Sequence, residues 1–127
     1  MVDLHLEGVK KRLILQMWDT AGCEKYRSMT VSHTRGALGA IVTYDITDEI
    51  SFLNCEYWVT GLKKHMDPYS IIALCANKVD ITHIWPGKRE VMPQQAEEFA
   101  KKHDLLFLGE CSALDNYNVR ETINAMV

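Results

Sequence analysis

The amino-acid sequence predicts an α/β domain built around a mostly parallel sheet. Through the C-terminal two thirds, short apolar β-rich runs alternate with segments whose apolar residues recur every three or four positions. This alternation is typical of βαβ units, in which helices cover a parallel sheet and the crossovers are right-handed. With 127 residues the chain is long enough for one domain, and residues 1–127 are expected to form it.

Composition argues against several classes of partner and location for the protein. A net charge of −3 provides no basic footprint for nucleic acid. No apolar run approaches the roughly 18 residues that span a membrane, and residues 1–7 do not resemble a signal peptide. We therefore expect a cytoplasmic protein. The four cysteines form no C-x-x-C pair, which argues against a zinc site, and Cys55 and Cys75 are expected to be small core residues.

The N-terminal segment predicts a hairpin followed by a loop. Apolar and polar residues alternate over 2–7, as in a half-buried strand, and Gly8 opens a turn. A second strand is expected over Lys11 to Trp18. Residues 19–35 are polar, with weak helical character over 25–32, and are expected to form a loop directly after that strand.

The middle of the chain predicts a central strand and a long helix. Residues 39–45 are continuously β-rich, which favours a strand covered on both faces. Thr47 or Asp48 is expected to cap the next helix, which Asp67-Pro68 ends. The buried stripe of this helix is expected to contain Phe52, Cys55, Val59, Leu62 and Met66.

The C-terminal part repeats the pattern. A buried strand is expected over 71–76, then a polar loop that contains Pro86-Gly87, and then a helix with Pro93 in its first turn that continues through His103. A short strand over 105–108 follows. The chain is helical again from Asn118 onward, with Val119, Ile123 and Met126 on one face.

Polar residues follow three of the predicted strands. Asp19, Asn77 and Ser112 each come after a strand, so they are expected at the carboxyl edge of the sheet, where α/β proteins bind ligands.

Two of these positions belong to short motifs with a chemical rationale. In Asn77-Lys78-Val79-Asp80, the carboxylate suits the adjacent N1–H and amine of guanine, and the lysine stem suits the face of the base. In Asp19-x-x-Gly22, the carboxylate suits a hydrated Mg²⁺ and the glycine N–H suits a phosphate. Each motif taken alone also fits an ordinary surface turn.

Three segments together resemble the Ras-like small GTPases, and the Rab branch in particular. Trp18-Asp19-Thr20-Ala21-Gly22 with Glu24 to Arg27 is similar to the second-switch segment of that family. Residues 77–80 resemble its base-specificity motif, and Glu110-Cys111-Ser112-Ala113-Leu114 resembles its second base-contacting loop.

The resemblance implies the Ras-like P-loop NTPase fold, GTP/GDP and Mg²⁺ as cofactors, and a GTP/GDP switch in vesicle traffic. It implies Mg²⁺ binding through water at Asp19, and effector and regulator binding through residues 19–35. The nucleotide-binding residues that it implies are Asp19, Gly22, Asn77, Lys78, Asp80, Ser112, Ala113 and Leu114. In the family, the N–H at the Ala113 position meets the guanine oxygen.

The sequence departs from the family pattern where phosphate chemistry is concerned. No G-x-x-x-x-G-K-[ST] occurs, and the family places that loop, its strand and the following helix before the first residue here. The fold is therefore expected to lack the first strand, the phosphate-binding loop and the first helix, with impaired nucleotide binding. The catalytic position of the water-orienting glutamine is Cys23, so hydrolysis is expected to be slow or absent.

Smaller departures concern register, partners and membrane attachment. Gly109 is an apparent one-residue insertion, expected to form a bulge or to displace Ser112 and Ala113. His33-Thr34 replaces a pair of tyrosines usual in Rab proteins, so partner choice is expected to differ. The chain carries no cysteine-bearing tail for prenylation, so no intrinsic membrane anchor is expected although the family is peripheral on endomembranes.

Two alternatives remain at the level of sequence. The first is a non-enzymatic remnant that binds no nucleotide and acts at most as a partner-binding module. The second is a reductase-like or flavodoxin-like α/β domain, which fits the predicted topology but explains none of the three motifs.

Overall fold

A computed structural model describes residues 2–6, 9–20, 34 and 36–127, with the side chains of these residues from Ile14 onward. The element order is β1 (Val2–Leu6), β2 (Val9–Leu13), β3 (Gly39–Asp45), α2 (Glu49–His65), β4 (Ile71–Asn77), α3 (Val79–Ile84), η2 (Pro86–Lys88), α4 (Pro93–Lys102), β5 (Leu106–Glu110) and α5 (Val119–Asn124).

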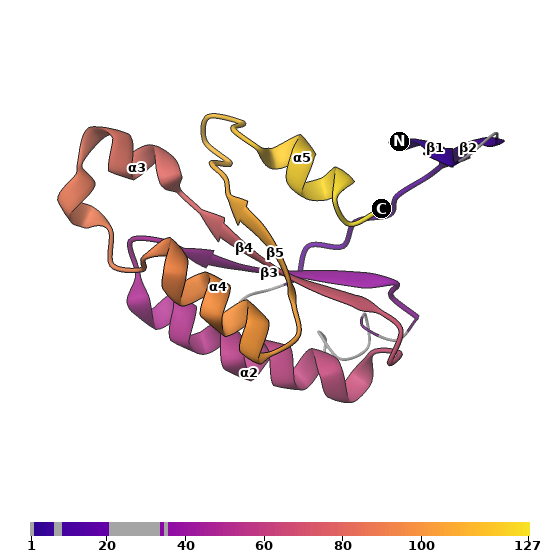
Figure 1. Ribbon diagram of the computed structural model, residues 1–127, viewed down its shortest axis with the longest axis horizontal. Helices are drawn as coiled ribbons and strands as arrows, with labels where there is room; N and C mark the ends of the chain where they lie inside the picture. Colours follow the sequence, from indigo (N-terminus) through magenta and orange to yellow (C-terminus); the bar gives the residue numbers. More distant parts are fainter. Residues whose placement is uncertain (1, 7–8, 21–33, 35) are drawn as a thin grey trace.

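The core of the molecule is a parallel three-stranded sheet in the order β3-β4-β5. Helices α2 and α4 cover one face of the sheet, and α5 lies against the other (Figure 1). The predicted α/β class with βαβ units is therefore confirmed. The buried side chains between the sheet and helices α2 and α4 include Val42, Tyr44, Phe52, Cys55, Val59, Leu74, Ala96 and Ala100.

Residues 39–45 form a strand as predicted, but the prediction that this strand is covered on both faces is wrong. The bounds of β3 are as expected, but β3 is an edge strand of the described sheet, and its residues alternate between exposed and buried. Strand β4 has the central place, with five consecutive buried residues over 72–76. Both strands are apolar, so sequence alone does not rank them by position.

Helix α2 follows the sequence prediction closely. Asp48 is the N-cap, since its side chain accepts a hydrogen bond from the Ser51 N–H at 3.2 Å. The helix buries its own residues Phe52, Cys55 and Val59. The predicted helix with Pro93 in its first turn is α4, and the predicted C-terminal helix is α5.

The N-terminal hairpin lies apart from the three-stranded sheet (Figure 1). Strands β1 and β2 pair antiparallel, with Val2 opposite Leu13. The predicted strand over Lys11 to Trp18 is wrong, because β2 begins at Val9 and ends at Leu13, and 14–20 have no regular structure. A strand needs a neighbour for its backbone groups, and no strand of the described residues pairs with 14–20. Ile14, Met17 and Trp18 are exposed there.

Gly109 forms a bulge, one of the two expected outcomes of the apparent insertion. Leu74 pairs with Phe107 but Ala76 pairs with Glu110, so β5 uses one more residue than β4 over this step. Gly109 has a φ of +79°, which glycine adopts without steric cost. The bulge absorbs the extra residue before the chain reaches Ser112.

Candidate functional site

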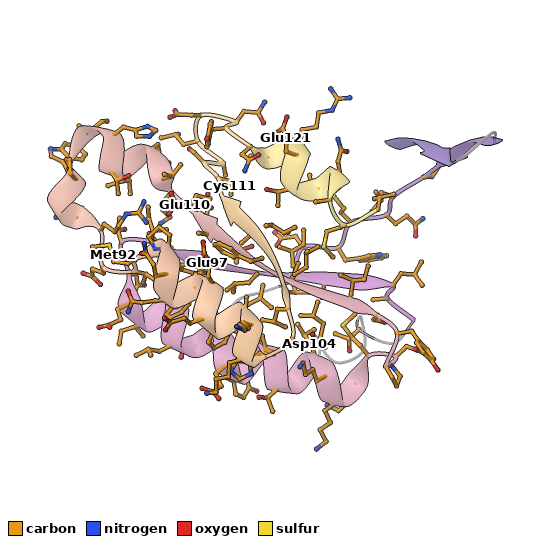
Figure 2. The ribbon with its side chains drawn as sticks, in the orientation of Figure 1. Met92, Glu97, Asp104, Glu110, Cys111 and Glu121 are labelled. Atoms are coloured by element: carbon orange, nitrogen blue, oxygen red, sulfur yellow. The ribbon has the colours of Figure 1, made fainter. Side chains whose placement is uncertain are left out.

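The carboxyl ends of β4 and β5 bring two of the predicted loops together. Asn77 is the last residue of β4, and Ser112 lies just past Glu110, the last residue of β5. Figure 2 shows Glu110 and Cys111 at this end of β5, with Asp104 at its opposite end. Because the strands are parallel, the loops over 77–80 and 111–114 leave the same edge of the sheet.

Asp80 and Ser112 join these loops through a short hydrogen bond. The Ser112 hydroxyl donates to Asp80 Oδ1 at 2.6 Å, and Ser112 is 1% exposed and Asp80 9% exposed. The same hydroxyl oxygen accepts from the Asp115 N–H at 3.0 Å. Asp80 lies in the first turn of α3, a helix that the sequence analysis assigned to a polar loop. The serine thus fixes the carboxylate and the turn that follows β5.

Asn77 makes the second link between the loops. Its Oδ1 accepts from the Lys78 N–H at 2.8 Å and from the Ala113 N–H at 3.1 Å. Lys78 has a φ of +71°, a left-handed conformation that costs a residue with a side chain roughly 1–2 kcal/mol. Strain of this kind is commonly retained at functional sites. The Val79 N–H donates to the Cys111 carbonyl at 3.2 Å, which adds a third link.

Asp45 positions the side chain of Lys78. Lys78 Nζ lies 2.7 Å from Asp45 Oδ2, while Asp45 Oδ1 accepts from the N–H and hydroxyl of Thr47. Partial burial alone would raise the pKa of Asp45, but the bonds from Lys78 and Thr47 outweigh it and hold this pKa below its ordinary value. The same contact raises the pKa of Lys78. Sequence reasoning gave Asp45 no role, although it ends β3 opposite Asn77.

A second ion pair holds the base of the β5 loop. Arg89 donates to both carboxylate oxygens of Glu110, at 2.6 and 3.1 Å, and to the Val91 carbonyl at 3.2 Å. Both side chains are partly buried. The bidentate geometry ties the segment after α3 to the residue that immediately precedes Cys111.

The structure does not bring every predicted site residue to this edge. Asp19 is exposed in the irregular segment 14–20, so the prediction that it directly follows a strand at the edge of the sheet is wrong. Leu114 lies on the loop after β5 and is 82% exposed. Gly22, Cys23 and most of the predicted partner-binding segment 19–35 lie outside the described residues.

The residues at the edge fit a guanine base. Asp80 is a buried carboxylate, and the hydrogen bond that the structure gives it comes from a neutral hydroxyl. None of the ion pairs among the described residues involves Asp80. Two adjacent N–H donors would compensate such a carboxylate.

A resident Mg²⁺ is not supported by the described residues alone. They contain no group of three or more His, Cys, Asp or Glu side chains placed to hold a metal. Mg²⁺ is commonly held by one or two carboxylates together with phosphates and water, so Asp19 alone does not make a site.

None of the described helices is long and apolar enough to span a membrane.

The chain is similar to a broad set of Ras-related proteins. It is 40% identical over 117 residues to the GTP-binding protein ypt3 of Schizosaccharomyces pombe, covering 92% of this chain and 52% of that protein. It is 39% identical over 123 residues to the Ras-related protein Rab-13 of Mesocricetus auratus, covering 97% of this chain and 57% of the relative. The chain thus spans about half the length of the curated relatives that it matches.

A plant relative extends the similarity over nearly the whole chain. The Ras-related protein RABA6b of Arabidopsis thaliana is 41% identical over 129 residues, covering 99% of this chain and 54% of that protein. The model of the Ras family matches residues 2–127. This match includes the hairpin, the sheet and both loops of the candidate site. The chain therefore belongs to the Ras family, and the relatives that it resembles include Rab proteins.

Proposed function

We propose that this chain binds the base of a guanine nucleotide at the edge formed by residues 77–80 and 111–114, as part of a Rab-type GTP/GDP switch. The observation that carries the proposal is the buried Asp80 carboxylate, fixed by the Ser112 hydroxyl at 2.6 Å. Guanine offers N1–H and an exocyclic amine side by side, and a carboxylate accepts both.

Each neighbour of Asp80 has a distinct part in this proposal. The Ala113 N–H, which donates to Asn77 Oδ1 in the structure, turns to the guanine oxygen when the base binds. The Lys78 stem, held by Asp45, covers the face of the base. Ser112 positions the carboxylate, and Asn77 Oδ1 still accepts from the Lys78 N–H. The bond from the Val79 N–H to the Cys111 carbonyl keeps the two loops in register. Exposed Leu114 borders the base.

The phosphate end of the nucleotide belongs to the second-switch segment in this proposal. Asp19 would hold Mg²⁺ through water, and the Gly22 N–H would meet the terminal phosphate. Mg²⁺ supplies charge neutralisation of the phosphates when it is bound. Cys23 lacks the amide that orients an attacking water, so we propose that hydrolysis is slow.

The cellular role follows the Rab relatives. We propose that effectors and regulators contact residues 19–35, and that the switch acts in vesicle traffic. The family match does not favour the alternative of a remnant that binds no nucleotide.

A titration with fluorescent GDP tests the proposal, with and without Mg²⁺. We expect micromolar or tighter binding that unlabelled GDP and GTP displace and ADP does not, because adenine lacks both donors that Asp80 accepts. Replacing Asp80→Ala should weaken binding by about tenfold or more. Asp115→Ala, which removes an exposed carboxylate of the neighbouring loop, is the matched control and should bind normally. Absence of binding, or equal displacement by ADP, would refute the proposal.

A further inference from the structure

Two buried thiols lie in contact beneath the candidate site. Cys75 of β4 and Cys111, the residue after β5, have their sulfur atoms 3.4 Å apart. Cys75 is 2% exposed and Cys111 7% exposed. Figure 2 labels Cys111 at the carboxyl end of its strand, next to Glu110. The pair joins β4 to the residue after β5 across 36 positions in the sequence, so no local sequence pattern predicts it.

The separation of the sulfur atoms is close to what a disulfide requires. A disulfide bond is about 2.05 Å long, so the two sulfur atoms would need to approach by about 1.4 Å. The two cysteines are staggered rather than directly opposite, since Ala76 pairs with Glu110 and the cysteines lie one residue before and one residue after that pair. Bringing the sulfur atoms together therefore needs movement of the backbone at residue 111, which lies past the end of β5, in addition to rotation of the two side chains.

Cys111 also belongs to the hydrogen bonds that join the two loops. Its sulfur lies 3.7 Å from Asn77 Oδ1, the atom that accepts from the Ala113 N–H. Its N–H donates to the Ala76 carbonyl at 2.7 Å, and its carbonyl accepts from the Val79 N–H. A change at this sulfur is thus transmitted directly to residues 77–79 and 113.

We propose that Cys75 and Cys111 form a dithiol that peroxide oxidises to a disulfide, and that this bond shifts the loop over 111–114. The expected effect of this loop shift on GDP binding rests on the proposed guanine site. Disulfides in reducing compartments are typically transient and redox-sensing, which is the behaviour proposed here.

The reaction balances with hydrogen peroxide as the oxidant. The sulfur of Cys111, the more exposed of the two, gives up its proton, attacks peroxide and breaks the O–O bond, which forms a sulfenic acid. The hydroxide that leaves takes up that proton and becomes the first water. The Cys75 sulfur then attacks the Cys111 sulfur. The S–S bond forms as the S–OH bond breaks, and the hydroxyl leaves with the thiol proton as water. The two sulfurs lose two electrons, and peroxide is reduced to two molecules of water.

Burial of the two thiols determines when they can be oxidised. Burial, with a smaller contribution from the neighbouring Cys111 thiol, raises the pKa of Cys75 to about 12, so its thiol is protonated in the closed structure. Because both thiols are also almost inaccessible, peroxide reaches them only when the loop after β5 opens locally. A bound base would hold that loop closed, so we expect GDP to slow oxidation.

Peptide mapping tests the disulfide directly in the wild-type chain. Trypsin places the four cysteines on four separate peptides, 13–25, 36–63, 65–78 and 103–120. After brief peroxide treatment and alkylation, we expect peptides 65–78 and 103–120 to appear linked, with the loss of two hydrogen atoms, and to separate on reduction. Cys55, which belongs to the hydrophobic core cluster that contains neither Cys75 nor Cys111, should remain a free thiol.

Variants and a second readout make the test specific. Cys75→Ser and Cys111→Ser should each abolish the linked peptide, whereas Cys55→Ser should retain it. Hydrogen exchange over 111–118 should differ between oxidised and reduced wild-type protein. GDP affinity should fall about tenfold on oxidation, as for the loss of one strong hydrogen bond, and recover with dithiothreitol.

The outcomes separate this proposal from the proposed function. Oxidation without a 75–111 link, or no oxidation, would overturn the dithiol. A link that leaves both loop exchange and GDP affinity unchanged would overturn its effect on the site. If neither form binds GDP while the link forms and alters loop exchange, the dithiol and the loop shift stand and the guanine site alone fails.

Discussion

The hydroxyl of Ser112 donates a 2.6 Å hydrogen bond to the carboxylate of Asp80, and this bond joins the loops that follow two parallel strands. Both residues are buried, so the bond is shielded from water. It holds the Asp80 carboxylate in one orientation before any ligand arrives. A pre-positioned carboxylate needs less ordering when it accepts hydrogen bonds from a base.

Removing this hydroxyl should weaken both the fold and the site. Ser112→Ala leaves the Asp80 carboxylate and the Asp115 N–H without their partner. We expect a loss of about 1–3 kcal/mol in the free energy of unfolding and weaker GDP binding. Denaturant unfolding and fluorescent GDP titration measure the two effects. Thr60→Ala, which deletes an exposed hydroxyl on α2, should change neither. Equal effects from both variants would contradict the assigned role of Ser112.

The charge of Asp45 should matter through Lys78. Asp45→Asn keeps an oxygen for Thr47 but removes the ion pair with Lys78 at 2.7 Å. We expect GDP binding to weaken by up to about fivefold, since a partly exposed pair contributes up to about 1 kcal/mol. Asp48→Asn also removes a charge near Lys78 and keeps the helix cap, so it is the control and should bind as wild type.

The same variant has a defined pH dependence. The folded-state pKa of Asp45 lies below its ordinary value of 3.8, so its stabilisation is present above that pH and is lost as pH falls through the folded pKa. The difference in thermal midpoint between wild type and Asp45→Asn should therefore shrink below about pH 3.8. A difference that grows as the pH falls would contradict this assignment.

Buried thiols should destabilise the protein at alkaline pH. Burial raises the pKa of Cys55 from 9.0 to about 12, so above pH 9 the unfolded chain loses this proton and the folded chain keeps it. The stabilisation is complete below pH 9 and is lost as pH rises toward 12. Cys55→Val removes this group at similar volume. It should reduce the slope of unfolding free energy against pH by about 1.4 kcal/mol per unit in that window. Parallel slopes in denaturant unfolding would refute it.

Local signals account for the parts of the fold that sequence predicted well. Asp48 caps α2, Pro93 begins α4, and the apolar run over 39–45 forms β3, because capping, proline geometry and strand propensity act within a few residues. The Asn77 and Asp80 positions at the carboxyl edge followed from the βαβ pattern.

Errors and omissions arose where distant segments decide the structure. The neighbours of β3, and the lack of a described partner for residues 14–20, depend on strand pairing across the chain. The contacts between Asp45 and Lys78, and between Cys75 and Cys111, join residues far apart in sequence. Helix α3 was missed because it is six residues long, too short for a clear periodic pattern.

The central claim is that Asp80 reads a guanine base, and exchanging its chemistry tests this most directly. Asp80→Asn replaces an acceptor by an amide that donates to the C2 oxygen of xanthine, which guanine lacks. Competition against fluorescent nucleotide should show GDP affinity falling at least about tenfold and xanthosine diphosphate affinity rising above that of GDP. Asp115→Asn should preserve the preference for GDP. An Asp80→Asn protein that still prefers GDP, or a wild type that does not distinguish the two nucleotides, would contradict the account.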